Sequence, residues 1–361
     1  MATSRVSSAG LPEIRTRVGR ALDDFLDRQR GALGAIGADM LPWMDAITGL
    51  LASGKRLRPA FCYWGWRAAG GEDCPQIYAA AAALELLHAS ALVHDDLMDA
   101  SDTRRGQPSV HRRFAAVHAD GGWRGSADAF GAGAAILIGD LLMAWTDQLF
   151  TGSGLPAAGL RRGQPVLDAM RAELICGQYL DLLGQAAGDG TVDSALRVVR
   201  FKSAKYTVER PLQLGVALAA PPAGDPATER ACRGYGIPVG VAFQLRDDVL
   251  GVFGDPAQTG KPASDDLREG KRTVLVAIAR ERAGAPDREL LDRLLGDRLL
   301  DEAGAKQIRS ILTETGALAE CELMIESSVA EGLAALEHAP MTGEAKLALA
   351  ELAVVATARS D

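Results

Sequence analysis

The sequence predicts an all-α protein built as one helical bundle. Long segments repeat apolar residues at three- and four-residue spacing, which is the spacing of a helix with one buried face. Aromatic residues are only 5% of the chain, which disfavours a β-rich fold. Because 48% of the 361 residues are hydrophobic, the chain can bury a large core. We expect a single domain over residues 21–358, preceded by a flexible segment at residues 1–20.

The helical spacing is clearest in a series of long segments, which glycine- and proline-rich loops separate. None of these loops is long enough to be a linker between domains. The stretch 119–133 is rich in glycine, and we interpret it as a surface loop. The expected helices are 15–30, 76–99, 134–150, 167–183, 195–219, 228–253 and 344–358.

The composition argues against several classes of protein. With 39 basic and 47 acidic residues the net charge is -8, whereas a general nucleic-acid binder needs a broad basic surface. The five cysteines lack zinc-ligand spacing and suit the reduced thiols of a cytoplasmic protein. The N-terminus has no apolar signal-peptide segment, and the most apolar stretch, 78–93, is interrupted by Glu85 and His88. We therefore expect a cytoplasmic protein that is not an integral membrane protein.

Two carboxylate clusters close apolar helical segments and carry the main functional signal. Asp95, Asp96 and Asp99 form a D-D-x-x-D pattern, in which residues four apart share a helix face. Asp247 and Asp248 form the second cluster. Carboxylates at a helix C-terminus oppose the helix dipole, so two solvated helix ends are a poor explanation. Adjacent carboxylates favour Mg2+, which proteins often hold together with substrate phosphates. Proton transfer by paired acids, as in glycosidases, is the alternative.

Lysines and arginines flank both carboxylate clusters in the sequence. Two like charges about 4 Å apart repel by roughly 1 kcal/mol in water and roughly 4 kcal/mol at an effective dielectric near 20, so bare carboxylates would repel a phosphate. A bridging divalent ion reverses that sign. The pattern therefore indicates two diphosphates, one bound through metal and one bound by Lys and Arg directly. The basic residues are Lys55, Arg56, Arg58, Arg104, Arg105, Lys202, Lys205, Lys261, Lys271 and Arg272.

These motifs match a known family over residues 21–358. The matching segments are GKRLRP at 54–59, HDDLMDASDTRRGQPSVH at 94–111, GD at 139–140, FQLRDD at 243–248 and GKPASDDLREGKRT at 260–273. The chain resembles the trans-prenyl diphosphate synthases, and the run KSAKYTVERPLQLG at 202–215 is similar to the actinobacterial geranylgeranyl diphosphate synthases. The resemblance implies an isoprenoid-synthase-type helical bundle around a central cavity.

The resemblance also implies a role for each matching residue, with about three Mg2+ ions in the active site. The metal ligands would be Asp95, Asp96, Asp99, Asp247 and Asp248. Isopentenyl diphosphate would bind at Lys55, Arg58, His88 and Arg105. The allylic diphosphate would bind at Arg104, Lys202, Ser203, Gln244, Lys261 and Lys271. The catalytic residues would be Asp95, Asp96, Asp99, Arg104, Lys202, Asp247 and Lys261.

Two positions depart from the family pattern. Ser203 stands where the family usually has threonine, and it keeps the hydroxyl. Gly251 replaces the last aspartate of the second motif, and Asp255 lies beyond the normal i+4 position. One metal-bound water would then lose its partner, so we expect reduced metal affinity at most and retained activity.

The reaction follows from the resemblance. Mg2+ and cationic side chains draw the diphosphate off the allylic substrate, and the double bond of isopentenyl diphosphate attacks the resulting carbocation. The product would grow along the helix before Asp95, where Ser90 and Ala91 are small and Leu87 lies further back. Since no large aromatic blocks this depth, we expect geranylgeranyl diphosphate as product. Farnesyl and longer-chain diphosphates are the alternatives.

Other classes of protein share some of these features. A class I terpene cyclase also uses D-D-x-x-D and Mg2+, but the N-x3-S-x3-E motif expected of it is not found after Asp247. A non-catalytic synthase subunit would usually lose one aspartate motif, and a helical interaction protein would not need the clustered cations. The family resemblance further suggests a homodimer, with helices within residues 134–183 as the interface.

Overall fold

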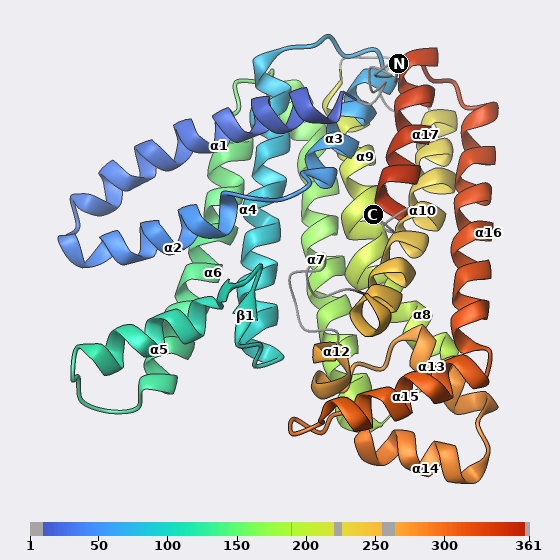
Figure 1. Ribbon diagram of the computed structural model, residues 1–361. Coiled ribbons are helices and arrows are strands. Elements are labelled where there is room, and N and C mark those ends of the chain that lie inside the picture. The colour runs from blue at the N-terminus through green and yellow to red at the C-terminus, as the bar shows by residue number, and fades with distance from the viewer. Residues whose placement is uncertain (1–9, 189, 220–225, 255–263, 358–361) are drawn as a thin grey trace, which may run out of the picture. The chain divides into compact units, whose positions relative to one another are not determined.

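Helices make up nearly all of the chain in the computed structural model, which describes residues 10–188, 190–219, 226–254 and 264–357 (Figure 1). The predicted all-α class is confirmed. Within the described residues, the strands are β1 (Thr103–Arg104) and β2 (Gln107–Pro108), which form a small antiparallel hairpin.

The described chain divides into two compact units, and the predicted single domain over residues 21–358 stays a prediction. The first unit comprises residues 10–164, 211–219 and 342–349 of the described chain. The second comprises the described parts of residues 165–210, 225–341 and 350–357. Because the chain passes between the units several times, and does so inside α7 and α17, no single linker separates them.

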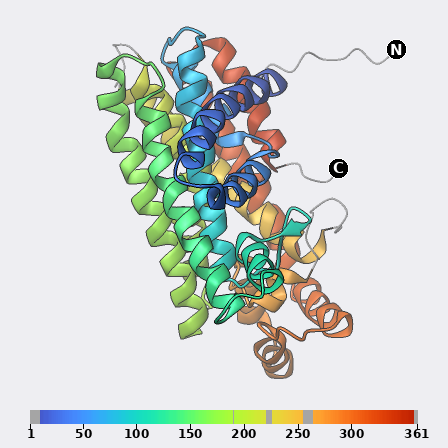
Figure 2. The same ribbon diagram turned by 90° about the vertical axis from the view of Figure 1, so that its left-hand side faces the viewer.

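The first unit is assembled around α4 (Pro75–Met98). Figures 1 and 2 show α4 and α6 (Ala127–Thr151) running side by side. Ser90 Oγ of α4 donates to the carbonyl oxygen of Gly139 at 2.8 Å. A Cβ on Gly139 would overlap the imidazole of His94, so the glycine permits this close approach. The other elements of the unit are α1 (Leu11–Gly34), η1 (Ala38–Met40), α2 (Leu41–Leu51), α3 (Leu57–Ala68), α5 (Val110–Asp120), the first turns of α7 (Ala157–Ala187), most of α9 (Arg210–Leu218) and the start of α17 (Gly343–Thr357).

Two predicted loop segments differ from the structure. The helix α1 begins at Leu11, inside the segment predicted to be flexible, because Pro12 suits a first turn and the apolar face begins at Ile14. The predicted surface loop 119–133 is wrong in its second half, since α6 begins at Ala127 with Ser126 as its N-cap. In the rest of that segment, the ring of Trp123 packs against the ring of Phe130 in α6, with 5.2 Å between their centroids.

The second unit is assembled around α10 (Pro226–Phe253), which packs on α16 (Ala317–Glu337) and on η2 (Val199–Glu209). The segment η2 is a π-helix, a form that is frequent at functional sites. The predicted continuous helix 195–219 is therefore three elements in the structure, α8 (Val192–Val198), η2 and α9. The remaining helices are α12 (Asp265–Glu269), α13 (Val274–Arg282), α14 (Ala285–Leu294) and α15 (Glu302–Glu314).

Among the described residues, α4 and α6 are long and apolar enough to cross a membrane by length and composition. In the apolar window of α4, 72% is buried inside the protein, against 44% for α6. A core helix passes the same test, so these two helices are weak evidence for a membrane span.

Candidate active site

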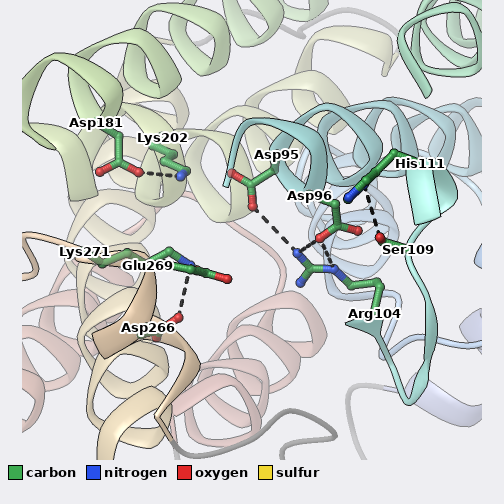
Figure 3. Close-up of polar contacts among 10 residues, drawn as sticks. All are labelled: Asp95, Asp96, Arg104, Ser109, His111, Asp181, Lys202, Asp266, Glu269 and Lys271. Atoms are coloured by element: carbon green, nitrogen blue, oxygen red, sulfur yellow. Dashed lines mark hydrogen bonds and ion pairs between the residues drawn. The ribbon is translucent and has the colours of Figure 1, made fainter. Parts of the chain in front are cut away.

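The first carboxylate cluster lies at the C-terminal end of α4, where Asp96 holds an arginine. Arg104 of β1 donates to Asp96 through Nε at 2.8 Å and through Nη2, and Nη2 lies 3.8 Å from Asp95 Oδ2 (Figure 3). The Asp96 side chain is only 3% exposed, whereas that of Asp95 is 19% exposed. The two adjacent aspartates therefore have different surroundings: Asp96 anchors Arg104, and Asp95 is the more accessible carboxylate.

The hairpin turn between β1 and β2 determines where Arg104 and Arg105 reach. Arg105 and Gly106 both have positive φ, 53° and 73°, as a tight two-residue turn requires. Arg105 Nη1 donates to the carbonyl oxygens of Leu50 at 3.0 Å and Ser53 at 2.7 Å. Arg105 thus braces the loop between α2 and α3, a contact that sequence reasoning did not predict.

This loop carries Lys55, one of the predicted isopentenyl diphosphate ligands, and Arg58 and His88 lie in α3 and α4. Lys55 is exposed, and Arg58 lies half-buried in the first turn of α3. Burial, followed by the charges of Arg58 and Arg105, lowers the pKa of His88 well below its ordinary value near 6.5. His88 is therefore neutral at physiological pH. It donates a hydrogen bond through one ring nitrogen and accepts one at the other. Lys55, Arg58, His88 and Arg105 all belong to the first unit, and the charges of Arg58 and Arg105 act on His88.

The predicted chain-length residues of α4 have different surroundings. Leu87 and Ser90 are completely buried, and Ser90 is committed to its hydrogen bond with α6. Ala91 is half-buried. Of these three side chains, Ala91 is the one that reaches accessible space.

The second carboxylate cluster lies near the C-terminal end of α10, and its charges are crowded. Gln244 Nε2 donates to Asp248 Oδ1 at 2.7 Å. Burial raises the pKa of Asp248 to about 7, the bond from Gln244 opposes this shift, and the charges of Asp266 and Asp247 add to it. A divalent cation would relieve this crowding.

Gly251 does not leave an empty place in the second cluster. A Cβ on Gly251 would overlap the carboxylate of Asp266, which comes from α12. Asp266 Oδ1 accepts from Lys271 Nζ at 3.0 Å, and Lys271 also lies 2.7 Å from Glu269 (Figure 3). A carboxylate from another helix thus stands beside the position where the family motif has its last aspartate.

The predicted lysine of η2 is paired with an acid on α7. Lys202 Nζ lies 2.6 Å from Asp181 Oδ2 (Figure 3), and a Cβ on Gly177 would overlap the Lys202 backbone. The neighbouring Ser203 is buried. Lys261, predicted to bind the allylic diphosphate, lies outside the described residues.

Sequence reasoning missed three acids that set the geometry of the predicted residues: Glu85, Asp181 and Asp266. Each pairs with a cation far along the chain or from another turn, so no local spacing marks it. The signal that could have found Glu85 is its place in an apolar helix, because an acid buried there needs a partner.

The donor set of both clusters suits a hard cation, because it consists of carboxylate oxygens. Within the residues that the structure describes, no three His, Cys, Asp or Glu side chains converge into a complete metal site. Mg2+ commonly binds through one or two carboxylates and completes its coordination with water and substrate phosphates.

Comparison with known proteins identifies the family to which this chain belongs. Residues 42–312 match the family model of polyprenyl synthetases. The chain belongs to the polyprenyl synthetase family. It is 36% identical over 271 residues to a geranylfarnesyl diphosphate synthase from Aeropyrum pernix, covering 74% of this chain and 78% of that one. It is 34% identical over 276 residues to a geranylgeranyl diphosphate synthase from Mycobacterium tuberculosis, covering 76% and 73%.

A solved structure of a polyprenyl synthetase relative extends the likeness to nearly the whole chain. The geranylgeranyl pyrophosphate synthase from Corynebacterium glutamicum, complexed with isoprenyl diphosphate and magnesium, has a TM-score of 0.92 and 39% identity. The match covers 97% of this chain and 99% of that chain. The predicted family and reaction class are confirmed: this polyprenyl synthetase is an enzyme, a trans-prenyl diphosphate synthase.

Proposed function

We propose that this polyprenyl synthetase condenses isopentenyl diphosphate with dimethylallyl, geranyl and farnesyl diphosphates, and that its main product is geranylgeranyl diphosphate. The observation that supports this most is that each unit carries a carboxylate cluster with cations of its own, Arg104 beside Asp95 in one and Lys271 beside Asp266 in the other. Such sets suit diphosphate bound with divalent metal.

About three Mg2+ ions are assigned to four aspartates. These are Asp95 and Asp99 in the first unit and Asp247 and Asp248 in the second. When bound, Mg2+ neutralises the charge that develops on the departing diphosphate. Asp96 has a different part, because its carboxylate already accepts two hydrogen bonds from Arg104. It holds the guanidinium ready to contact the allylic diphosphate.

Cationic and polar side chains bind the allylic diphosphate in this proposal. They stabilise the negative charge on the diphosphate as the allylic C–O bond breaks and its electron pair leaves with the oxygen. The double bond of isopentenyl diphosphate then attacks the allylic carbocation, and a proton is lost to the departing diphosphate. The proposed contacts are Arg104, Lys202, Ser203, Gln244, Lys261 and Lys271.

The diphosphate of isopentenyl diphosphate is assigned to Lys55, Arg58, His88 and Arg105. Lys55 supplies an exposed point charge, and Arg58 a fork of donors from the first turn of α3. His88, kept neutral by its surroundings, donates one N–H. Arg105 already uses Nη1 to brace the loop, so its contact would come from the rest of its guanidinium.

Product length is proposed to depend on Ala91 more than on Ser90, because Ser90 is enclosed between α4 and α6. Ala91→Phe should shorten the main product by at least one five-carbon unit, while Ser90→Ala should leave product length unchanged. Chromatography of the dephosphorylated alcohols measures both. An unchanged distribution in Ala91→Phe would contradict this placement.

A homodimer and a cytoplasmic location complete the proposal. On α7, Ile175, Tyr179 and Leu183 are exposed at four-residue intervals, and on α6 Ile136 and Leu137 are exposed. Exposed apolar stripes of this kind suit a helix interface between two copies. Light scattering should give twice the chain mass, and Tyr179→Glu should shift it toward the monomer.

Incubation of the purified protein with Mg2+, labelled isopentenyl diphosphate and each allylic primer tests the proposed function. Geranylgeranyl diphosphate should dominate with every primer. A main product of fifteen or of twenty-five or more carbons would overturn the chain-length assignment, and a cyclic hydrocarbon would overturn the reaction.

A further inference from the structure

The loop that joins α2 to α3, residues 52–56, has a strained backbone. Arg56 has a φ of 55°, in the left-handed region that residues with a side chain seldom adopt, and Gly54 has a φ of 142°. Such a conformation persists only where the surroundings impose it. Lys55 lies between these two residues and Arg58 follows them, so the turn determines where both side chains point.

The Arg56 side chain holds this turn from inside the first unit. Its guanidinium donates to the Glu85 carboxylate on α4 and to the carbonyl oxygen of Leu51, the last residue of α2. The side chains of Arg56 and Glu85 are only 7% and 4% exposed. Arg105 holds the same loop through the carbonyl of Ser53. Two guanidinium groups therefore fix the backbone on either side of Gly54.

A buried ion pair is a poor device for stability alone, because apolar residues of similar volume often stabilise a protein as well or better. The charge of Glu85 has a second effect here. Burial lowers the pKa of His88, and the charges of four arginines add to this shift: Arg58, Arg105, Arg104 and Arg56. Burial lowers the pKa of Arg105, and the Glu85 carboxylate opposes that shift. Glu85 thus acts as a buried counter-charge within a cluster of arginines.

We propose that Glu85 and Arg56 are positioning residues for the isopentenyl diphosphate subsite. Their ion pair imposes the turn that presents Lys55 and Arg58, and neither member of the pair contacts the substrate. This inference rests on the proposed function, in which Lys55 and Arg58 bind that diphosphate.

The test compares two variants with the wild-type enzyme. Glu85→Gln removes the charge and keeps the size, and the double variant Arg56→Met/Glu85→Leu replaces the pair with apolar groups. The double variant leaves no unpaired buried charge, so its Tm should stay at or above that of the wild type. Both variants should bind isopentenyl diphosphate on the order of tenfold more weakly in isothermal titration calorimetry, because its ligands are misplaced. The KM for isopentenyl diphosphate should rise in parallel, and the KM for farnesyl diphosphate should not change.

Matched controls separate the possible failures. Arg30→Met/Asp45→Leu removes an exposed 3.1 Å ion pair between α1 and α2 of the same unit and should change neither KM. Arg56→Lys, which keeps the charge, should recover part of the lost affinity relative to Arg56→Met. The inference is overturned if the folded double variant binds isopentenyl diphosphate like the wild type, or if both KM values rise equally. Lys55→Ala/Arg58→Met tests the subsite itself. Normal binding of isopentenyl diphosphate by this variant would reject the proposed function at these residues. Lost binding in this variant, together with normal binding in the Glu85 and Arg56 variants, would reject only the positioning role.

Discussion

The two carboxylate clusters share a sequence pattern but have different electrostatic surroundings. In the first unit, Arg104 neutralises Asp96, and burial, followed by the charges of nearby arginines, lowers the pKa of His88. In the second unit, burial and the neighbouring carboxylates raise the pKa of Asp248 to about 7. The first unit therefore gathers positive charge around His88, and the second gathers negative charge around Asp248. Two similar aspartate motifs in one chain can therefore have different electrostatic properties.

This contrast indicates how each cluster would respond to metal. In the first cluster, Arg104 lies close to both adjacent aspartates, so it can hold their side chains in place before metal binds. The second cluster repels itself until a cation arrives, apart from the partial relief that Lys271 gives to Asp266. We expect the second cluster to depend more steeply on Mg2+ concentration.

The largest expected effect is on Asp95 compared with Asp247. Asp95→Ala should lower kcat by at least about a hundredfold, because preorganised charge at the leaving group is lost. Asp247→Ala should lower kcat less, and a higher Mg2+ concentration should recover part of the lost kcat, since Asp248 and Asp266 remain. Steady-state kinetics over a Mg2+ series measures both. Asp128→Ala, which changes an exposed carboxylate of α6 paired with Arg112, is the control and should act like the wild type. Near-normal turnover of Asp95→Ala at saturating Mg2+ would reject the metal assignment.

A smaller loss is expected when Arg104 is released. Asp96→Asn removes a charge-assisted hydrogen bond worth roughly 1.5 kcal/mol or more, which corresponds to about tenfold in rate. The KM for the allylic substrate should rise with it. If kcat falls as far as in Asp95→Ala and recovers with added Mg2+, Asp96 is itself a metal ligand and the distinction between the two aspartates fails.

The charge around His88 predicts a pH dependence of stability. The pKa of His88 is depressed in the folded state, so the unfolded chain takes up its proton first as pH falls below about 6.5. The stability that neutral His88 contributes is therefore present above that pH and is lost as pH falls toward the folded pKa. Thermal unfolding at pH 7.5 and 5.5 should show a smaller difference in Tm for His88→Gln than for the wild type. The exposed His338→Gln should keep the wild-type difference, and an equal change in both variants would contradict the assignment.

The smallest expected effect is at Gly251. Gly251→Ala places a methyl group where the Asp266 carboxylate lies and should displace it from Lys271. The Mg2+ concentration for half-maximal activity should rise by about tenfold, the lower end of the effect of groups that stand beside metal ligands. The swap Gly251→Asp/Asp266→Ser should restore it. Unaltered Mg2+ dependence in Gly251→Ala would show that Asp266 has no part in the cluster.

The sequence predicted the helical class and the place of both clusters near helix ends, because these depend on local patterns. The spacing of apolar residues marks α4 and α10, and each aspartate cluster lies near the end of its helix. The boundaries at α1 and α6 were missed, because a capping serine or proline is a weak signal beside glycine-rich surroundings.

The partners of the predicted residues could not be deduced in the same way. Arg56 and Glu85 are 29 residues apart, and Lys202 and Asp181 are 21 apart. Such pairs depend on how the helices pack and not on any repeat in the sequence. The place of Asp266 beside Gly251 also follows from packing between α12 and α10, so the expectation of a simple loss at Gly251 was incomplete.

The most direct test of the central claim, that both carboxylate clusters hold divalent metal together with diphosphate, is a crystal structure with Mn2+ and inorganic diphosphate. Anomalous scattering from Mn2+ would locate the ions without relying on activity. The account predicts peaks beside Asp95 and Asp99 and a further peak beside Asp247. A fully occupied first cluster with no peak at Asp247, or ions held by Asp96 in place of Asp95, would contradict it.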